Sequence, residues 1–280
     1  MLERAAGAEG LISLLTDRID AKLIAGSPHL RAISNYAVGT DNVDLGAATE
    51  RGIPVGNTPD VLTDATADLA FALLLAAARR LPEAARSVQA GDWLTWEPAR
   101  YLGQSVHGAT LGIIGLGRIG RAVAARARGF EMEVLTTGTG SAPDMPLEAL
   151  LGRSDFVSLH CPLTPATRHL IDSAALRRMR PTAILINTAR GPIVDQVALV
   201  RALHDGSIAG AALDVTDPEP TGPDDPLLGA PNLLVTPHIG SATIAARERM
   251  AELAVENLLA GLAGRPMPHQ ANSLTRPPAR

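Results

Sequence analysis

The chain has 280 residues, enough for two domains, although length alone leaves a single large α/β domain open. Its 25 basic and 29 acidic side chains leave a net charge of −4, which indicates neither a nucleic-acid-binding surface nor attraction to an anionic membrane. One cysteine excludes a disulfide framework and a cysteine-cluster metal site, and the only lysine, Lys22, argues against Schiff-base chemistry and a P-loop.

The sequence shows no targeting or membrane segment. Its first residues lack the basic-then-apolar pattern of a signal peptide, and the longest apolar run, Leu69–Ala78, is about half of what a membrane span requires. We therefore expect a soluble, cytoplasmic and reduced protein.

The first part of the chain carries weak strand signals. They lie at Leu11–Leu15, Leu30–Ser34 and Ile53–Gly56, with a possible helix at Ile19–Ala25. An Ala- and Leu-rich stretch, Val61–Arg79, follows and is long enough to bridge two domains.

Short apolar strands then alternate with amphipathic helices. Because the strands are apolar nearly throughout, they are typical of parallel strands covered by helices on both faces, so the alternation predicts a doubly wound parallel sheet. The expected strands are Leu111–Ile114, Met132–Thr136, Asp155–Leu159, Ala183–Asn187, Ala209–Asp214 and Leu233–Thr236. The expected helices are Arg118–Arg128, Pro146–Leu151, Ser173–Arg178 and Asp195–His204.

The last element is one long amphipathic helix, Ser241–Leu262, with Ser241 as its expected N-cap. The tail from Ser273 has little to bury, and we expect it to be disordered. We predict a discontinuous substrate domain, residues 1–57 and 243–280, with a dinucleotide-binding domain, residues 58–242, inserted into it.

A glycine-rich turn predicts the nucleotide site. Gly115, Gly117 and Gly120 form a Gly-x-Gly-x-x-Gly pattern between an expected strand and helix. In that context the glycines permit a tight turn, close approach of a pyrophosphate and helix–strand packing, and the helix N-terminus offers free N–H groups. Arg118 can add a charge there, and Ile119 completes the turn.

The end of the next strand bears on cofactor choice. A carboxylate usually binds the ribose of NAD there, but residues 135–141 contain neither an acidic side chain nor an arginine for a 2′-phosphate. Small hydroxyls such as Thr139 beside glycines such as Gly138 can accept either ribose. The sequence favours NADP slightly over NAD, because nothing there repels the phosphate.

Three candidate catalytic side chains follow expected strands. Arg190, Glu219 and His238 come after the fourth, fifth and sixth of them, and ligands of doubly wound sheets bind at that edge. Each alone is more often solvated or structural than catalytic, but their joint placement points to a shared site.

Their chemistry suits a 2-oxo acid. Arg190 offers a planar fork for a carboxylate, and His238 can give a proton to a carbonyl oxygen as hydride arrives. Glu219, if hydrogen-bonded to the imidazole, fixes its tautomer and favours its protonated form. His160 can line the cofactor cleft, but packing is the favoured interpretation, and Cys161 is expected to be a small buried hydrophobe.

At these residues the chain resembles the D-isomer-specific 2-hydroxyacid dehydrogenases over nearly its whole length. The motifs that carry the resemblance are Asn35–Gly39, Asn57–Asp64, Gly115–Gly120, His160–Thr164, Asn187–Gly191, Asp214–Val215, Asp217–Pro220 and Pro237–Thr243. Within the family, Asp92–Trp93, Thr95–Pro98 and Arg265–Pro268 are most similar to the glyoxylate/hydroxypyruvate reductase branch.

The resemblance implies the same roles for Arg190, Glu219 and His238. It adds substrate contacts, with Val38 and Gly39 binding the carboxylate through their backbone and Leu15 and Ser241 nearby. It places Pro162, Thr188 and Asp214 along the nicotinamide half of the cofactor. His238 and Gly240 are further expected cofactor contacts.

The resemblance also implies a homodimer through the segment after Asp60. Trp96 is then expected to reach toward the partner's substrate site, although plain interface packing of Trp93 and Trp96 is an equal alternative.

Two departures from the family pattern stand out. Family members begin with a strand and helix before the counterpart of Leu11–Leu15, so we expect a Rossmann-type sheet inserted into a smaller flavodoxin-like substrate domain that is truncated at its N-terminus. The stretch Gly138–Met145 is also shorter than usual, which leaves cofactor choice open.

The sequence therefore predicts an NAD(P)H-dependent reductase of glyoxylate or hydroxypyruvate. One alternative is another D-2-hydroxyacid dehydrogenase, of the lactate or phosphoglycerate type. A second is a non-catalytic dinucleotide-sensing protein, against which the intact Arg190, Glu219 and His238 argue.

Overall fold

The computed structural model describes residues 5–138 and 145–274, so the predictions for Thr139 and for residues 275–280 lie outside it. The chain divides into two compact units, which are described separately. The first unit is Met1–Leu62 with Ala242–Arg280, and the second is Thr63–Ser241.

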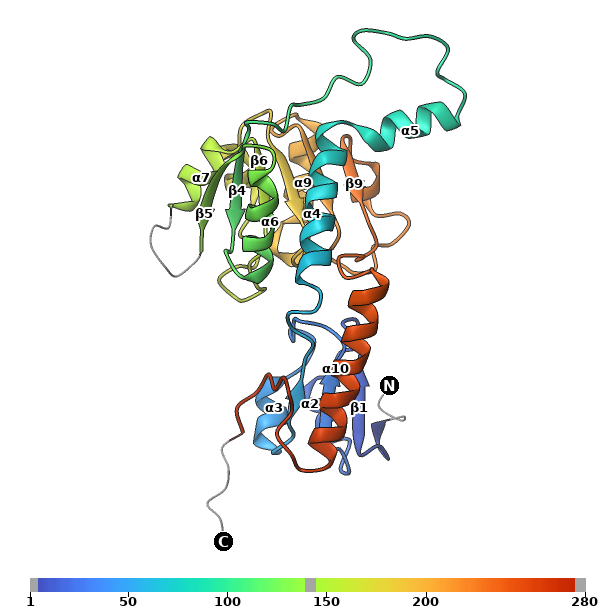
Figure 1. The fold of residues 1–280 in the computed structure, drawn as a ribbon, viewed down its shortest axis with the longest axis vertical. Helices are drawn as coiled ribbons and strands as arrows, with labels where there is room; N and C mark the ends of the chain where they lie inside the picture. The colour runs from blue at the N-terminus through green and yellow to red at the C-terminus, as the bar shows by residue number, and fades with distance from the viewer. Residues whose placement is uncertain (1–4, 139–144, 275–280) are drawn as a thin grey trace. The chain divides into compact units, whose positions relative to one another are not determined.

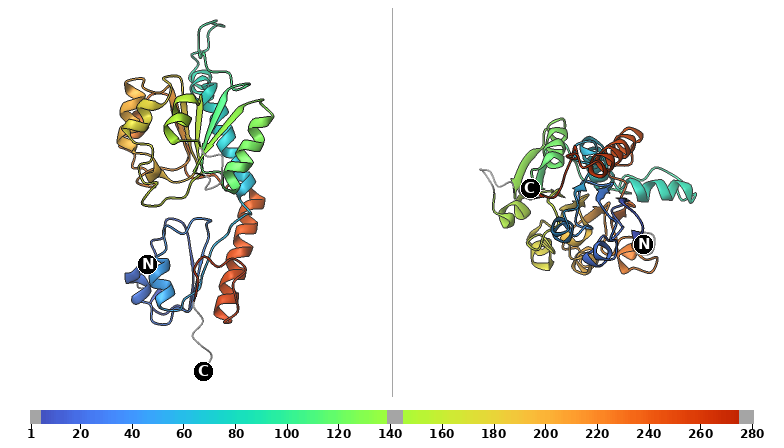
Figure 2. Two further views of the ribbon diagram at one scale, coloured as in Figure 1. Left: turned by 90° about the vertical axis from the view of Figure 1, so that its left-hand side faces the viewer. Right: turned by 90° about the horizontal axis from the view of Figure 1, so that it is seen from below.

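The first unit is built on a parallel sheet of three strands, in the order β1 (Gly10–Ser13), β2 (Ala32–Asn35), β3 (Val55–Gly56). Helices α2 (Ala21–Ala25) and α3 (Leu45–Glu50) cover one face, and α10 (Ile244–Leu262) covers the other (Figures 1 and 2).

Helix α10 is fixed to the end of β3 by Asn257. Its buried side chain donates to the Asn57 carbonyl and accepts from the His269 amide, at 2.8 and 2.9 Å. A Cβ added to Gly56 would lie 2.7 Å from the Asn257 Cβ, so glycine is needed for this close approach.

The expected N-cap of α10 is wrong. Thr243 is the N-cap, with its hydroxyl accepting from the Ala246 amide at 3.2 Å, and Ser241 precedes the helix. The cap is the residue directly before the first helical turn, and the chain does not enter the helix until Ile244.

The second unit contains a parallel sheet of six strands. Their order is β5 (Glu133–Thr137), β4 (Thr110–Ile114), β6 (Phe156–Leu159), β7 (Ile184–Asn187), β8 (Gly210–Leu213), β9 (Leu233–Val235). Each strand ends within one residue of its predicted bounds, and the predicted doubly wound α/β fold is confirmed.

Helices cover both faces of this sheet (Figures 1 and 2). On one face, α4 (Thr63–Ala78) and α6 (Arg118–Arg128) bury a cluster that includes Leu74 and Phe156. On the other face, α7 (Leu147–Arg153), α8 (Ser173–Arg178) and α9 (Gln196–His204) bury a second cluster. Two short 3-10 helices follow β7 and β8, at Gly191–Ile193 and Pro226–Gly229.

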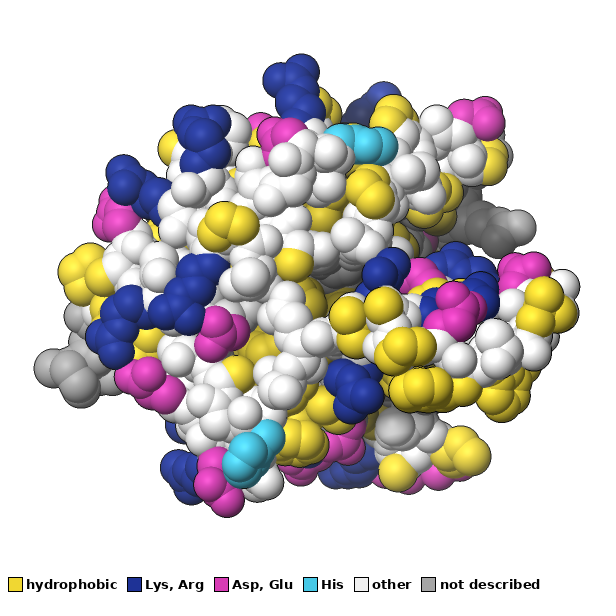
Figure 3. Space-filling model, turned by 90° about the horizontal axis from the view of Figure 1, so that it is seen from above, with side chains coloured by type: hydrophobic (Ala, Val, Ile, Leu, Met, Phe, Trp, Pro, Cys, Tyr) yellow, Lys and Arg dark blue, Asp and Glu magenta, His cyan; other side chains and the backbone are white. Residues whose placement is uncertain are grey.

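Helix α5 (Leu81–Gln89) and residues 90–104 extend from the end of α4, and we call them the arm (Figure 1). The arm exposes six large apolar side chains: Leu81, Val88, Trp93, Leu94, Trp96 and Leu102. Figure 3 shows the surface from above, with hydrophobic side chains in yellow. None of the helices in the described part of the chain is long and apolar enough to cross a membrane.

Candidate active site at the carboxyl edge of the six-stranded sheet

The direction of winding of the six-stranded sheet changes beside β4. The chain leaves β4 for β5 on one side and returns to β6 on the other, which makes the β4–β6 boundary the topological switch point. Ligands of doubly wound sheets bind at such a point, beyond the carboxyl ends of the strands.

The glycine turn lies at this switch point. Gly115 has a φ of +94°, and a Cβ there would lie 2.6 Å from the Cys161 nitrogen. A Cβ on Gly120 would lie 2.2 Å from the Gly115 oxygen, so two of the three glycines are needed for packing.

Gly117 differs, because a Cβ there would meet nothing within 4 Å. Gly117 is also the N-cap of α6 and makes no side-chain cap, which leaves the first N–H groups of that helix for another partner. Exposed Arg118 and half-buried Ile119 follow it. An open space above uncapped helix amides fits the pyrophosphate of a dinucleotide.

Three further observations concern a dinucleotide. Strand β5 ends at Thr137 and is followed by Gly138, with a φ of +72°, so the described end of this strand carries no carboxylate. Thr188, after β7, has a buried hydroxyl without a hydrogen-bond partner in the described residues. Pro162 is exposed after β6, and its carbonyl accepts from the Thr167 hydroxyl at 2.6 Å.

The structure brings His238 and Glu219 together. The imidazole Nδ1 is hydrogen-bonded to the Glu219 carboxylate, and both side chains are about three-quarters buried, with 22% and 25% of their surface exposed. Because a carboxylate only accepts, Nδ1 carries the hydrogen and Nε2 is left for another partner.

Asp214 fixes the turn that carries His238. Its carboxylate is buried and accepts from the Thr236 hydroxyl and the Ile239 and Gly240 amides, at 2.6, 2.8 and 2.7 Å. Its carbonyl accepts from the His238 amide at 2.9 Å, and His238 itself has a φ of +51°. The left-handed conformation of His238 is therefore held by bonds on both sides.

Asn187 holds the turn with Arg190. Its amide donates to the Arg190 carbonyl at 2.9 Å, and its oxygen accepts from the Ala189 amide at 3.0 Å. A Cβ on Gly191 would lie 1.9 Å from the Thr216 oxygen, so the loops after β7 and β8 are in contact.

Gln196 supports the loop with Glu219, since its oxygen accepts from the Asp217 amide at 3.1 Å. The loops after β7, β8 and β9 are thus joined in a series. The predicted catalytic residues Arg190, Glu219 and His238 lie on these three connected loops, one on each.

Three predicted substrate contacts lie in the first unit, near the carboxyl ends of its strands. The Asn57 and Asn35 amides donate to the Val38 and Gly39 carbonyls, each at 2.8 Å, and half-buried Leu15 follows β1. Ser241 is the last residue of the second unit.

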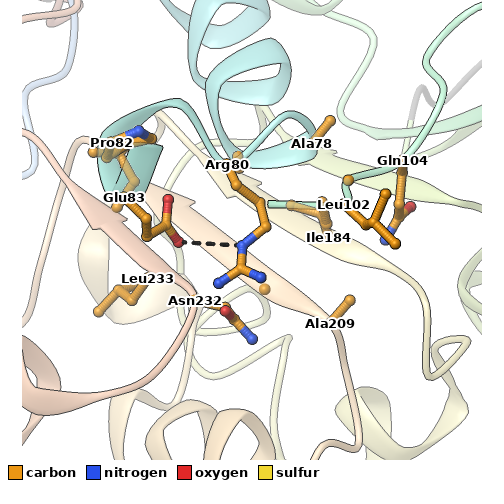
Figure 4. Close-up of a pocket in the computed structure, with 14 residues that line it drawn as sticks. Ala78, Arg80, Pro82, Glu83, Leu102, Gln104, Ile184, Ala209, Asn232 and Leu233 are labelled. Carbon is orange, nitrogen blue, oxygen red and sulfur yellow. Dashed lines mark ion pairs between the residues drawn. The ribbon is translucent and has the colours of Figure 1, made fainter. Parts of the chain in front are cut away.

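Trp96 is 79% exposed on the arm. The arm begins at the opposite, amino-terminal edge of the six-stranded sheet. A pocket there is lined by Arg80, Leu102, Ile184 and Asn232 among others, and Figure 4 shows the Arg80 side chain directed between Glu83 and Asn232. The Arg80 Nε lies 3.9 Å from the Glu83 carboxylate. This pocket contains none of the predicted site residues.

Comparison with known proteins agrees with this geometry. Residues 71–240 match the family model of the D-isomer specific 2-hydroxyacid dehydrogenase, NAD binding domain. The chain belongs to this dehydrogenase family. The predicted resemblance and enzyme class are confirmed, and the protein is an NAD(P)-dependent oxidoreductase.

Several relatives are similar over most of their length. A glyoxylate reductase of Korarchaeum cryptofilum is 52% identical, over 99% of this chain and 88% of the relative. A glyoxylate reductase of Thermococcus onnurineus is 48% identical, over 93% of this chain and 81% of the relative.

Solved structures give the same result. A Thermus thermophilus protein has a TM-score of 0.91 at 53% identity, over 96% of this chain and 88% of that chain. A second structure is that of an NADPH-dependent glyoxylate/hydroxypyruvate reductase from Sinorhizobium meliloti, solved with NADP and malonate. It has a TM-score of 0.87 at 34% identity, over 99% of this chain and 88% of that chain.

Sequence reasoning missed the supporting residues of this dehydrogenase. Asp214 was expected only along the cofactor, and the structure shows that it also organises the His238 turn. Asn187 stood only in the Asn187–Gly191 motif without a role of its own, and Gln196 gave no signal, because their partners are backbone groups that a pattern of side chains does not reveal.

Proposed function

We propose that this dehydrogenase reduces glyoxylate and hydroxypyruvate to the corresponding 2-hydroxy acids, with His238 as proton donor. The observation that carries the assignment of roles is the His238–Glu219 pair, anchored by Asp214 at the carboxyl edge of the NAD-binding domain. Relatives that are named glyoxylate reductase and share 52% and 48% sequence identity with this chain support the choice of substrate.

The hydrogen bond between Nδ1 of His238 and Glu219 determines which ring nitrogen donates the proton. Bound NADH or NADPH supplies the hydride that reaches the carbonyl carbon. His238 gives the proton from Nε2 to the carbonyl oxygen, and Glu219 accepts from Nδ1 and stabilises the ring while it is charged. The neutral ring then regains a proton from solvent, which completes the balance.

The substrate carboxylate is assigned to Arg190, whose fork can bind two oxygens and whose charge stabilises the developing alkoxide. In our proposal the backbone N–H groups of Val38 and Gly39 add contacts to the carboxylate, with Leu15 and Ser241 nearby. The Asn57 and Asn35 bonds support this role, because they hold the loop from its carbonyl side.

Either nicotinamide cofactor is assigned to the crevice at Gly117, with NADP slightly favoured. The missing carboxylate at the described end of β5 supports this preference, since no negative charge there repels a 2′-phosphate. Pro162, Thr188, Asp214 and Gly240 are assigned to its nicotinamide half.

We also assign the arm to a homodimer interface, because a patch with Trp93, Leu94 and Trp96 exposed is larger than scattered surface apolar groups. Leu94→Glu should convert a particle of two chains to one chain in light scattering. Val197→Glu is the control, because Val197 is also an exposed apolar residue but lies in α9, and it should leave the mass unchanged. A wild-type mass of one chain would contradict this assignment.

A kinetic panel tests the reaction. Initial rates of NADH and NADPH oxidation with glyoxylate and hydroxypyruvate should exceed those with bulky 2-oxo acids by about tenfold or more in kcat/KM. A preference for bulky acids would favour another 2-hydroxyacid dehydrogenase, and cofactor binding without turnover would favour a sensor.

A further inference from the structure

His160 lies at the switch point of the sheet but has no place in the proton transfer described above. It is the first residue after β6, as Gly115 is the first after β4. The His160 amide donates to the Ile114 carbonyl at 2.8 Å, and a Cβ on Gly115 would lie 2.8 Å from the His160 carbonyl carbon. The peptide after His160 therefore forms a wall of the glycine turn.

The ring of His160 is held by Ser158. The Nε2 atom lies 2.8 Å from the Ser158 hydroxyl, two residues earlier along the strand and so on the same face of the sheet. Ser158 is 1% exposed. A hydroxyl can donate or accept, so this bond survives in either tautomer of the ring. Within residues 5–138 and 145–274, Nδ1 has no hydrogen-bond partner.

The ring is neutral under physiological conditions. Burial lowers the pKa of His160 to about 4, because the charged form loses its hydration there. The side chain therefore brings no positive charge to a phosphate. Its contribution must come from position and neutral hydrogen bonding.

We propose that His160 is a positioning residue of the cofactor site. Ser158 holds the ring, and the ring holds the His160–Cys161–Pro162 backbone against Gly115, which sets the width of the crevice that receives the dinucleotide. The inference rests on the proposed use of NADH or NADPH by this crevice.

NADH fluorescence titration of the full chain tests the proposal. His160→Ala and Ser158→Ala should each raise the NADH dissociation constant about tenfold, the size expected for one lost hydrogen bond. The double variant should be no weaker than either single one, since both remove the same bond.

A conservative pair of variants separates the two nitrogens. His160→Gln places a nitrogen near the Nε2 position and should bring the dissociation constant within about threefold of wild type, whereas His160→Asn reaches only the Nδ1 position and should not. The kcat at saturating NADH should be preserved in all of them. His204→Ala, an exposed histidine in α9, is the control.

Several outcomes would overturn the proposal. They are wild-type NADH affinity in a folded His160→Ala, additive effects in the double variant, or affinity losses that track lost cooperative unfolding with no recovery in His160→Gln. Failure of the wild-type chain to bind NADH would instead refute the proposed function.

Discussion

The buried carboxylate of Asp214 offers the sharpest test of how the His238 turn is held. In Asp214→Asn one oxygen can still accept from Thr236 and Ile239. The new NH2 group then faces the Gly240 amide at the position where an oxygen now lies 2.7 Å away. Two donors are brought together, and the Gly240 N–H loses its acceptor.

The magnitude follows from these bonds. A hydrogen bond to a charged group contributes roughly 1.5–3 kcal/mol, and a buried donor left unsatisfied costs about 1–3 kcal/mol. Asparagine is easier to bury than a carboxylate, which offsets part of the loss. We expect the free energy of unfolding to fall by about 3 kcal/mol, and kcat to fall at least about tenfold because the His238 turn shifts.

Urea unfolding followed by circular dichroism measures the first effect, and NADH oxidation measures the second. Asp205→Asn is the matched control, because the Asp205 carboxylate also accepts from a backbone amide, that of Ser207 at 2.9 Å, but on the surface. The control should change stability by less than about 0.5 kcal/mol. Equal stability of the two variants would refute the reasoning.

Three further predictions concern the glycines and His160. Gly117→Ala should leave the melting temperature nearly unchanged but weaken NADH binding. Gly120→Ala should lower the melting temperature, because a Cβ on Gly120, unlike one on Gly117, would lie 2.2 Å from a backbone oxygen. Equal melting temperatures of the two variants would contradict this prediction. Gly191→Ala should cost more than about 3 kcal/mol in urea unfolding, since its Cβ would lie 1.9 Å from the Thr216 oxygen, and a near-neutral effect would count against the packing of these loops. Because the pKa of His160 is lowered in the folded protein, the unfolded chain binds more protons than the folded one below pH 6.5, the ordinary pKa of histidine. The free energy of unfolding should therefore fall by up to about 3 kcal/mol between pH 6.5 and pH 4. This part of the pH dependence should vanish in His160→Gln.

Sequence periodicity predicted the six-stranded sheet well because its four central strands are buried on both faces and so have continuous apolar runs. Two helices escaped it for opposite reasons. Helix α3 (Leu45–Glu50) is short and buries only Ala48, so it has no apolar stripe to detect. Helix α5 follows Arg80 in a left-handed conformation and does carry an apolar stripe with Leu81, Ala84 and Val88, but the structure leaves Leu81 and Val88 exposed, so this stripe does not face the core.

Some features of the candidate site could also be predicted from the sequence, and others depend on tertiary structure. The placement of Arg190, Glu219 and His238 on neighbouring loops was predictable because side chains that follow parallel strands share one edge of the sheet. The hydrogen bond between Glu219 and His238 joins loops from two different strands, so only a structure gives it. The capture of backbone amides by Asp214 also depends on tertiary geometry.

The central claim is that His238 donates the proton in a nicotinamide-dependent reduction. The most direct test compares wild type with His238→Ala in two measurements, glyoxylate-dependent NADH oxidation and NADH binding by fluorescence. We predict that turnover falls by roughly 10²- to 10⁴-fold while the NADH dissociation constant stays within about threefold of wild type. Unchanged turnover in a variant that binds NADH normally would contradict the assignment of the proton donor.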